Sequence, residues 1–410
     1  MDGDFAARLR ASLARQEELI RSSLVLNPVE NFPIPEDLRV AAGPLHGLYS
    51  SDKVRSREQR LGTVMQFAGR EAMEHDVREI YSAWAKALTA GDVTLRVLSG
   101  LHAHATLFMA MARPEQKVLL LPVEAGGHVS GRAILERLGL EIIDMAVDEE
   151  GLCVDQEATM ERLGHQPDFI FVDRSEGLVF EDFSGLANLD GAVTIFDSSQ
   201  YLTNVIAGDH PNPFNWGFDL MVASVHKNFP GPQKALLATR REDDLWRQIL
   251  SGVSSYVSNM HTTSTYVTGL TLSRQDWLAD YSKRMLKTAI MLEDELLERK
   301  VPVVKRRRDL PPTHHLWIRE RSREKAFETY ERLEQCSIDT NFRLLPYSLG
   351  YGIRVGMSAV VRLGLTEADV PRLAELIAEV RSQGPTIALK DGCGTFAREL
   401  WAREQSLKGE

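Results

Sequence analysis

Seven short apolar runs, separated by helical segments, constrain the fold of this chain more than any other feature. They occupy residues 93–98, 117–122, 141–146, 169–173, 192–197, 219–225 and 235–239. Most lack the polar alternation of a half-exposed strand, as expected of strands buried on both faces of a parallel sheet. Helical segments at 102–112 and 130–138 separate several of them, which is typical of an α/β domain with right-handed crossovers. The sequence therefore predicts a mostly parallel seven-stranded sheet.

The rest of the chain predicts a second, smaller domain. A chain of 410 residues exceeds what one hydrophobic core normally accommodates, so two domains are expected. A long helical stretch at about 269–299 is followed by alternating pieces of strand and helix, which predicts a C-terminal α+β domain. These pieces are the strand-like segments 314–319, 340–345 and 351–356 and the helical segments 323–336 and 367–381.

The expected division of the chain is an N-terminal arm and dimer-contact segment at 1–60, a large domain at 61–280 and a small domain at 281–410. Residues 3–22 have the periodicity of an amphipathic helix that packs on a partner subunit. A further helix is expected at about 72–88.

Charge and composition exclude several classes of protein. With 48 Lys and Arg against 58 Asp and Glu the formal charge is −10, whereas a general nucleic-acid binder shows a basic face. No apolar stretch approaches ~18 residues, so we expect no membrane span. The cysteines Cys153, Cys336 and Cys393 are few and far apart, which predicts neither a disulfide framework nor a metal site. Without a signal-peptide pattern at the N-terminus, the expected location is the cytoplasm.

Two polar residues that close apolar runs carry the chemistry. Lys227 follows the run at 219–225 and precedes the rigid turn Pro230-Gly231-Pro232, and Asp197 closes the run at 192–197. Each alone has a structural interpretation, as a solvated strand end or a turn-forming carboxylate. Together, a lysine amine can form a Schiff base and a carboxylate can hold a pyridine nitrogen protonated. The pair predicts a pyridoxal phosphate (PLP) enzyme.

Three weaker motifs agree with this prediction. Ser99-Gly100 opens a helix after the first apolar run, and a helix N-terminus attracts phosphate. Gly126-Gly127-His128 offers a close backbone approach and an imidazole that can stack on a pyridine. Arg354, in a strand between glycines, presents the fork that binds a carboxylate. Each could equally be an ordinary turn or an edge-strand arginine.

Taken together, these residues resemble serine hydroxymethyltransferase and its relatives among the fold-type I PLP enzymes. The Ala-Gly-x-His-Pro-Asn-Pro and His-Lys-x-x-x-Gly-Pro pieces are specific, and the others are weak alone. The segments occur in the family's order between residues 25 and 360. They are Glu30-Asn31-Phe32, Ser99-Gly100, Gly126-Gly127-His128, Asp197, Ala207-Gly208-Asp209-His210-Pro211-Asn212-Pro213, His226-Lys227 with Gly231-Pro232, and Gly352-Ile353-Arg354.

The resemblance implies a set of site residues. Lys227 would form the Schiff base, Asp197 would pair with the pyridine nitrogen and His128 would stack on the ring. The other cofactor-binding positions implied are Ser99, Gly100, Ser175, Gln200 and His226, and His226 is also a catalytic candidate.

The resemblance also implies a substrate site and an oligomer. Arg354 would bind the carboxylate of an amino-acid substrate. Tyr49 would be catalytic and reach into the site of the neighbouring subunit, with Ser51 beside it. The family forms its active sites at a dimer interface, so an obligate homodimer is implied.

The chain departs from the family's pattern in the part that handles folate. The family has a glutamate two residues after the tyrosine, where this chain has Ser51 followed by Asp52. Its tyrosine-rich segment is replaced by residues 54–60. The remaining departures are Val29 for serine, Leu101 for serine, Gln200 for histidine and Gln233 for arginine.

These changes leave the cofactor groups intact and remove the acid associated with folate. We therefore expect cleavage of the Cα–Cβ bond of a β-hydroxy-α-amino acid, threonine or serine, without tetrahydrofolate. The glycyl unit would then be transferred to a second aldehyde, as in threonine transaldolases. The alternatives are a divergent tetrahydrofolate-dependent hydroxymethyltransferase with Asp52 in place of the glutamate, an aminotransferase or decarboxylase on the same fold, and a non-enzymatic PLP-binding homologue.

Overall fold

The chain is described by a computed structural model over residues 3–62, 67–257 and 260–406. Its residues group into two compact units: Asn31–Ser282, here called the sheet unit, and Met1–Glu30 with Lys283–Glu410, here called the terminal unit. The domain limits expected from sequence, 1–60, 61–280 and 281–410, stay a prediction. Among the described residues, no helix combines the length and apolar character that crossing a membrane would need.

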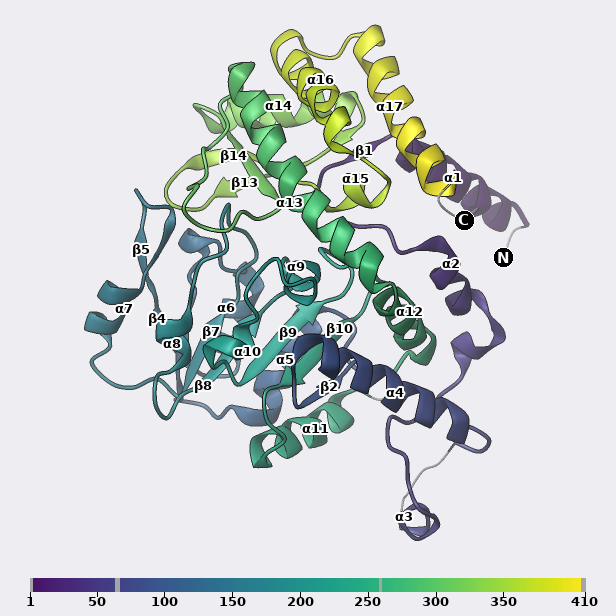
Figure 1. The fold of residues 1–410 in the computed structure, drawn as a ribbon, viewed down its shortest axis with the longest axis vertical. Coiled ribbons are helices and arrows are strands. Elements are labelled where there is room, and N and C mark those ends of the chain that lie inside the picture. The colour runs from purple at the N-terminus through teal and green to yellow at the C-terminus, as the bar shows by residue number, and fades with distance from the viewer. Residues whose placement is uncertain (1–2, 63–66, 258–259, 407–410) are drawn as a thin grey trace. The chain divides into compact units, whose positions relative to one another are not determined.

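The sheet unit is built on one seven-stranded sheet in the order β2-β10-β9-β8-β7-β3-β4 (Figure 1). β10 runs antiparallel to both of its neighbours, and all other neighbouring pairs are parallel. The predicted mostly parallel sheet is confirmed. Its strands are β2 Asp92–Thr94, β3 Lys117–Leu120, β4 Glu141–Asp144, β7 Phe169–Val172, β8 Val193–Asp197, β9 Leu220–Ser224 and β10 Ala235–Thr239.

The central strands are mostly apolar because both of their faces are covered. Every residue of β7, β9 and β10 is buried, whereas Glu141 and Asp144 at the ends of the edge strand β4 are exposed. Helix α5 packs against β9, β10 and α11, and its Leu107 and Phe108 enter the core with Val222 and Leu237. Continuous apolar runs are the pattern that such doubly covered strands require.

The remaining elements of the sheet unit are short connections and covering helices. Those with helical structure are α2 Pro35–Leu38, η1 Arg39–Ala42, η2 Pro44–Gly47, α3 Arg57–Leu61, α4 Glu71–Leu88, α5 Gly100–Met111, η3 Val123–Ala125, α6 Val129–Arg137, α7 Gln156–Arg162, α8 Ser184–Ala187, α9 Leu202–Ile206, α10 Pro213–Trp216, α11 Asp244–Tyr256 and α12 Thr262–Ser273. A small hairpin joins β5 Ala146–Asp148 to β6 Cys153–Asp155.

The single long helix expected at about 269–299 is two helices, so that prediction was wrong in detail. α12 ends at Ser273 and α13 Gln275–Glu298 begins two residues later. Arg274 between them leaves the helical conformation and donates hydrogen bonds to Asp37 at 3.2 and 2.8 Å. Thr271 donates to the same buried carboxylate at 3.1 Å. A tertiary ion pair therefore interrupts a sequence that is helical by periodicity alone.

The terminal unit contains a three-stranded antiparallel sheet, β11-β14-β13 (Figure 1). Helix α14 packs on β14, α16 packs on α14, and α17 packs on α16 and α1. The unit's elements are α1 Gly3–Arg21, β1 Leu24–Val25, β11 His315–Arg319, α14 Arg323–Gln335, β12 Ile338–Asp339, β13 Asn341–Leu345, β14 Gly350–Gly356, α15 Ser358–Arg362, η4 Glu367–Asp369, α16 Val370–Gln383 and α17 Ile387–Ser406. The expected α+β character of this part is confirmed.

A buried ion pair inside the terminal unit gives a test of this packing. Glu293 is fully buried and accepts hydrogen bonds from Arg306 at 2.5 Å and Arg308 at 2.9 Å. Glu293→Gln leaves the buried Arg306 cation without its carboxylate, which should cost about 3 kcal/mol or more. Asp294→Asn, which removes a half-exposed partner of Arg308, should cost less than about 1 kcal/mol. Urea unfolding midpoints of the two variants measure the difference, and equal midpoints would contradict the packing.

Candidate active site

Three neighbouring parallel strands end at the same edge of the sheet. β7, β8 and β9 pair in register, with Val172 opposite Phe196 and Asp197 opposite Val222. Polar residues follow each strand end: Asp173 after β7, Asp197 as the last residue of β8, and Lys227 three residues after β9. In α/β sheets the carboxyl ends of the strands are the usual place for a ligand.

A cavity lies at this edge of the sheet. Of the residues predicted from the sequence, it brings together Gly100, His128, Ser175, Asp197 and Lys227. The other lining residues, which the sequence analysis missed, are Leu101, His104, Asp173, Arg174 and Ser199.

The loop between β9 and β10 is fixed by hydrogen bonds on both sides of Lys227. Asn31 donates from its amide to the Lys227 carbonyl at 2.6 Å. Next to it, the side chain of Asn228 accepts from the Thr203 N–H at 2.7 Å. Gly231 donates to the Val225 carbonyl at 2.8 Å, which closes the turn. The backbone of the lysine is therefore held in place, and its side chain reaches the cavity.

Asp197 is a buried carboxylate with partners on both oxygens. Oδ2 lies 2.6 Å from Nε2 of His104, and Oδ1 accepts the Ser199 N–H at 2.6 Å. Burial alone would raise the pKa of Asp197, but the hydrogen bond and charge of His104 and the charge of Lys227 outweigh it and lower the pKa. The group is therefore an anion at neutral pH, as a partner for a protonated pyridine nitrogen must be.

His104 and Asp173 are the most informative residues that the sequence analysis missed. Both are 3% exposed, and Nδ1 of His104 lies 3.7 Å from Oδ2 of Asp173. A signal was present for each. His104 follows Gly100 by one helical turn on the buried face of α5, and Asp173 closes the run at 169–173 as Asp197 closes 192–197.

His128 is held by the glycine turn in front of it. Its backbone N–H donates to the Asp173 carbonyl at 3.2 Å, and its Nδ1 accepts the Ser130 N–H at 3.1 Å. In the neutral ring the proton is therefore on Nε2. A Cβ on Gly126 would lie 2.2 Å from the Glu176 carbonyl oxygen, and the same glycine accepts the Ser175 N–H at 2.9 Å. The absence of a side chain at Gly126 thus allows the loop with His128 to pack directly against the loop with Ser175.

The N-terminus of α5 opens into the cavity. Ser99 caps the helix by accepting the His102 N–H at 3.2 Å. A Cβ on Gly100 would lie 2.7 Å from Oγ of Ser224, so a side chain at this position would collide with the neighbouring strand end. The first turn of a twelve-residue helix offers a positive dipole end to an anionic group in the cavity.

Several predicted residues do not line this cavity. His226 places Nδ1 3.1 Å from the Lys234 carbonyl, and burial lowers its pKa. Tyr49 is 43% exposed and its ring contacts Phe67. The others are the cap residue Ser99, the buried Ser51, whose hydroxyl accepts the Lys53 N–H, the buried Gln200, and Arg354, which is buried on β14 of the terminal unit. Their functional roles stay predictions.

Asp52, the acid beside the Ser51 position, is part of a buried ion pair. Arg96 donates to its two oxygens at 2.8 and 2.9 Å. Burial alone would raise the pKa of Asp52, but the hydrogen bonds and charge of Arg96 outweigh it and lower the pKa. Asp52 is therefore an anion that binds an arginine and has no proton to donate at neutral pH.

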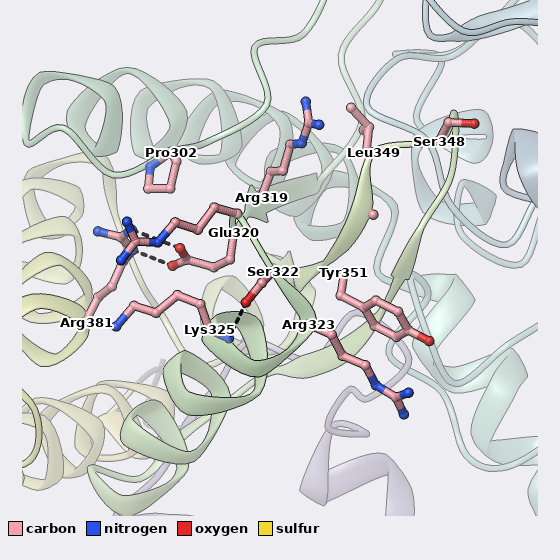
Figure 2. Close-up of a pocket in the computed structure, with 12 residues that line it drawn as sticks. Pro302, Arg319, Glu320, Ser322, Arg323, Lys325, Ser348, Leu349, Tyr351 and Arg381 are labelled. Carbon is pink, nitrogen blue, oxygen red and sulfur yellow. Dashed lines mark hydrogen bonds and ion pairs between the residues drawn. The ribbon is translucent and has the colours of Figure 1, made fainter.

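A separate hollow of about 900 Å³ lies in the terminal unit and is rich in arginine. Figure 2 shows Arg381 paired with Glu320, at 2.7 and 3.1 Å, and the guanidinium groups of Arg319 and Arg323 pointing in opposite directions. Side chains that are paired or diverge do not converge on one ligand. We assign no chemistry to this hollow.

His104, Asp173 and Asp197 are also a group whose ligand atoms lie within 4.8 Å of one another. The imidazole and the Asp197 carboxylate already bind each other directly at 2.6 Å, and Asp197 faces the same cavity as Lys227. This arrangement suits an organic cation such as a protonated pyridine, and we assign the three residues to a cofactor site.

A lysine, a buried carboxylate and a helix N-terminus at the strand ends of such a sheet define a fold-type I PLP enzyme. The family model described as serine hydroxymethyltransferase matches residues 4–377, and the chain belongs to this family. The predicted family, fold class and cofactor are thereby confirmed.

Similar proteins agree with this assignment. The serine hydroxymethyltransferase of Pyrobaculum calidifontis is 28% identical over 321 residues, which cover 75% of each chain. That of Picrophilus torridus is 24% identical over 385 residues, 90% of this chain and 87% of the relative. A crystal structure of L-threonine transaldolase from Pseudomonas fluorescens in its internal aldimine state superposes with a TM-score of 0.88 and 19% identity, over 98% of this chain and 91% of that one.

The residues present fit PLP. The cavity offers an amine on Lys227, an anion on Asp197 and a helix N-terminus at Gly100. Among the described residues, Oδ2 of Asp173 and Nδ1 of His104 have no hydrogen-bond partner although both are buried. Buried polar atoms without hydrogen-bond partners are expected where a polar ligand completes the site.

The glycine turn gives a test of how the site is held. Gly126 and Gly208 both have positive φ, +88° and +78°, but only Gly126 has a neighbour where a Cβ would stand. Gly208→Ala should cost only about 1–2 kcal/mol of backbone strain. Gly126→Ala should cost more and weaken PLP binding, because the loops with His128 and Ser175 must separate. Thermal unfolding and PLP titration of the apoprotein measure both effects; indistinguishable variants would refute the contact.

Proposed function

We propose that this enzyme cleaves the Cα–Cβ bond of a β-hydroxy-α-amino acid, threonine or serine, without tetrahydrofolate, and can pass the glycyl unit to a second aldehyde. One observation supports this above the others. The cofactor groups are assembled, while position 51 is serine and the adjacent Asp52 is bound by Arg96. The relatives are hydroxymethyltransferases by name and the structural neighbour is a transaldolase, so the residues must separate the two reactions.

When bound, PLP supplies an electron sink that takes up the electron pair of the bond broken at Cα. The chain's residues do the rest. Asp197 holds the proton of the ring nitrogen, which keeps the ring electron-poor. His128, whose Nδ1 accepts the Ser130 N–H, would stack on the ring. The first turn of α5 would bind the phosphate. Arg354 is the proposed partner of the substrate carboxylate.

Lys227 has two tasks in this proposal. Its amine would hold the cofactor covalently in the resting enzyme. When it is not bound to the cofactor, the same amine would accept the proton of the β-hydroxyl, which bond cleavage requires. Asp197 and Asp173, by contrast, lie in the buried part of the cavity beside His104 and serve the ring.

Substrate titration tests the reaction. We expect threonine, serine or glycine to shift the visible spectrum of the holoenzyme and the hydroxy acids to release a trappable aldehyde. Added tetrahydrofolate should change neither the spectral shift nor the rate of aldehyde release, because neither Ser51 nor the Arg96-bound Asp52 is an available acid. Lys227→Ala should lose both signals, while Lys86→Ala, an exposed lysine of α4, should keep them. A strong stimulation by tetrahydrofolate would instead support the hydroxymethyltransferase.

We further propose a homodimer in which Tyr49 serves the site of the partner subunit. Tyr49 is 43% exposed and does not line the cavity of its own chain, which is consistent with this role.

Subunit mixing tests shared sites. Lys227→Ala and Tyr49→Phe should each be nearly inactive alone. A hybrid dimer has one site with both native groups if those groups come from different subunits, so random mixing should restore about a quarter of the activity. Aldehyde release from refolded mixtures measures it. If the mixture stays as inactive as its parents, Tyr49 acts within its own chain or not at all.

A further inference from the structure

His104 lies next to Asp197, and both side chains line the cavity. Its Nε2 lies 2.6 Å from Oδ2 of Asp197, and both side chains are about 95% buried. The ring of Phe171 meets the imidazole edge-on, with centroids 5.0 Å apart, and fixes its plane. This well-packed imidazole, together with the Ser199 N–H on the other oxygen, fixes the direction of the buried carboxylate.

A second carboxylate faces the other nitrogen of the same imidazole. Oδ2 of Asp173 lies 3.7 Å from Nδ1 of His104, and neither atom has a hydrogen-bond partner among the described residues. A Cβ on Gly131 of α6 would lie 2.5 Å from this oxygen, so the helix makes room for the carboxylate only because glycine is there. Asp173 also lines the cofactor cavity.

Two buried carboxylates this close repel each other unless a cation lies between them. Burial alone would lower the pKa of His104, but the charges of Asp173 and Asp197 and the hydrogen bond to Asp197 outweigh it and raise the pKa. Burial raises the pKa of Asp173 to about 7. Asp197 has a lowered pKa, so it is the more fully ionised of the two carboxylates.

Other charged groups around the three residues are accounted for. Lys227, from the β9–β10 loop, opposes protonation of His104. Arg174, next to Asp173, forms an ion pair with Glu181 at 2.5 Å. His128 lies at the start of α6 and accepts the Ser130 N–H. The charge of Lys227 acts on both carboxylates, and the imidazole of His104 lies 2.6 Å from Asp197 and 3.7 Å from Asp173.

We propose that His104 and Asp173 are positioning residues of the PLP site. His104 bridges the two buried carboxylates and keeps Asp197 ionised and aimed into the cavity, and the charge that Asp173 retains helps to keep the imidazole protonated. This rests on the role proposed above for Asp197 as the partner of the pyridine nitrogen. It is independent of which bond of the substrate is broken.

Substituting His104 tests the bridge. His104→Asn keeps a neutral donor but removes the cation, so the Asp197 carboxylate gains affinity for a proton and binds the pyridinium less well. Loss of one charge-assisted hydrogen bond should weaken PLP binding to the apoprotein by about tenfold or more. With ¹⁵N-labelled PLP, the ¹⁵N resonance of the ring nitrogen should move toward the unprotonated position. A packing defect alone would not move it.

The matched control is His102→Asn, the same substitution on the same helix. His102 accepts the Leu98 N–H and has no contact with Asp197, so its variant should keep the wild-type ¹⁵N position. The proposal is overturned if His104→Asn binds PLP with wild-type affinity and an unchanged ring-nitrogen resonance.

Substituting Asp173 tests whether its charge keeps His104 protonated. This variant also provides a test of the proposal if His104→Asn does not fold. In the apoprotein both nitrogens of His104 should carry protons at neutral pH. Because the charge of Asp173 raises the pKa of His104, Asp173→Asn should lower it, and the second proton should leave at lower pH. Imidazole ¹⁵N–¹H spectra across pH measure this; an unchanged His104 titration would refute the role of Asp173.

The outcomes separate this inference from the proposed reaction. PLP affinity and the ring-nitrogen resonance are measured without substrate, so they can respond as expected even if no aldehyde is released from threonine or serine. In that case the reaction assignment fails and the positioning role stands. Conversely, aldehyde can be released as expected while the ring-nitrogen resonance of His104→Asn is unchanged. That result refutes only the positioning role.

Discussion

The parallel register of β7, β8 and β9 is the constraint on which the site depends. Val172 pairs with Phe196, so the next residues along the two strands, Asp173 and Asp197, emerge side by side. Neighbouring strands lie only about 4.8 Å apart, and two carboxylates at that spacing in a buried position strongly disfavour joint ionisation. His104 relieves this repulsion, because α5 places its imidazole at the same edge of the sheet.

The same edge explains the glycines around the cavity. Gly100, Gly126 and Gly131 each stand where a Cβ would come within 3 Å of an atom of the site. Their partners are Ser224 at the end of β9, and Glu176 and Asp173 in the loop that follows β7. Backbone is thereby packed directly against polar groups, which leaves the cavity space for a ligand. The absence of a side chain at these three glycines is therefore as necessary for the site as the side chains that line it.

Sequence patterns predicted the sheet well because its strands are doubly buried and continuous apolar runs leave few alternatives. They predicted Lys227 and Asp197 because each closes such a run. They missed His104 because its place one helical turn after Gly100 points to a role only when Asp173 and Asp197 are seen on either side of it. The interruption at Arg274 was missed for the same reason: it depends on Asp37, more than two hundred residues earlier.

The pairing of Asp52 with Arg96 bears on how this chain differs from its relatives. Arg96 is largely buried, with a side chain only 11% exposed, and it donates to both oxygens of Asp52 and to the Val257 carbonyl. Releasing Asp52 to act as an acid would leave a buried guanidinium unpaired, which is costly. Asp52 is thus held by Arg96 and is not available to replace the glutamate that the resemblance leads us to expect at position 51.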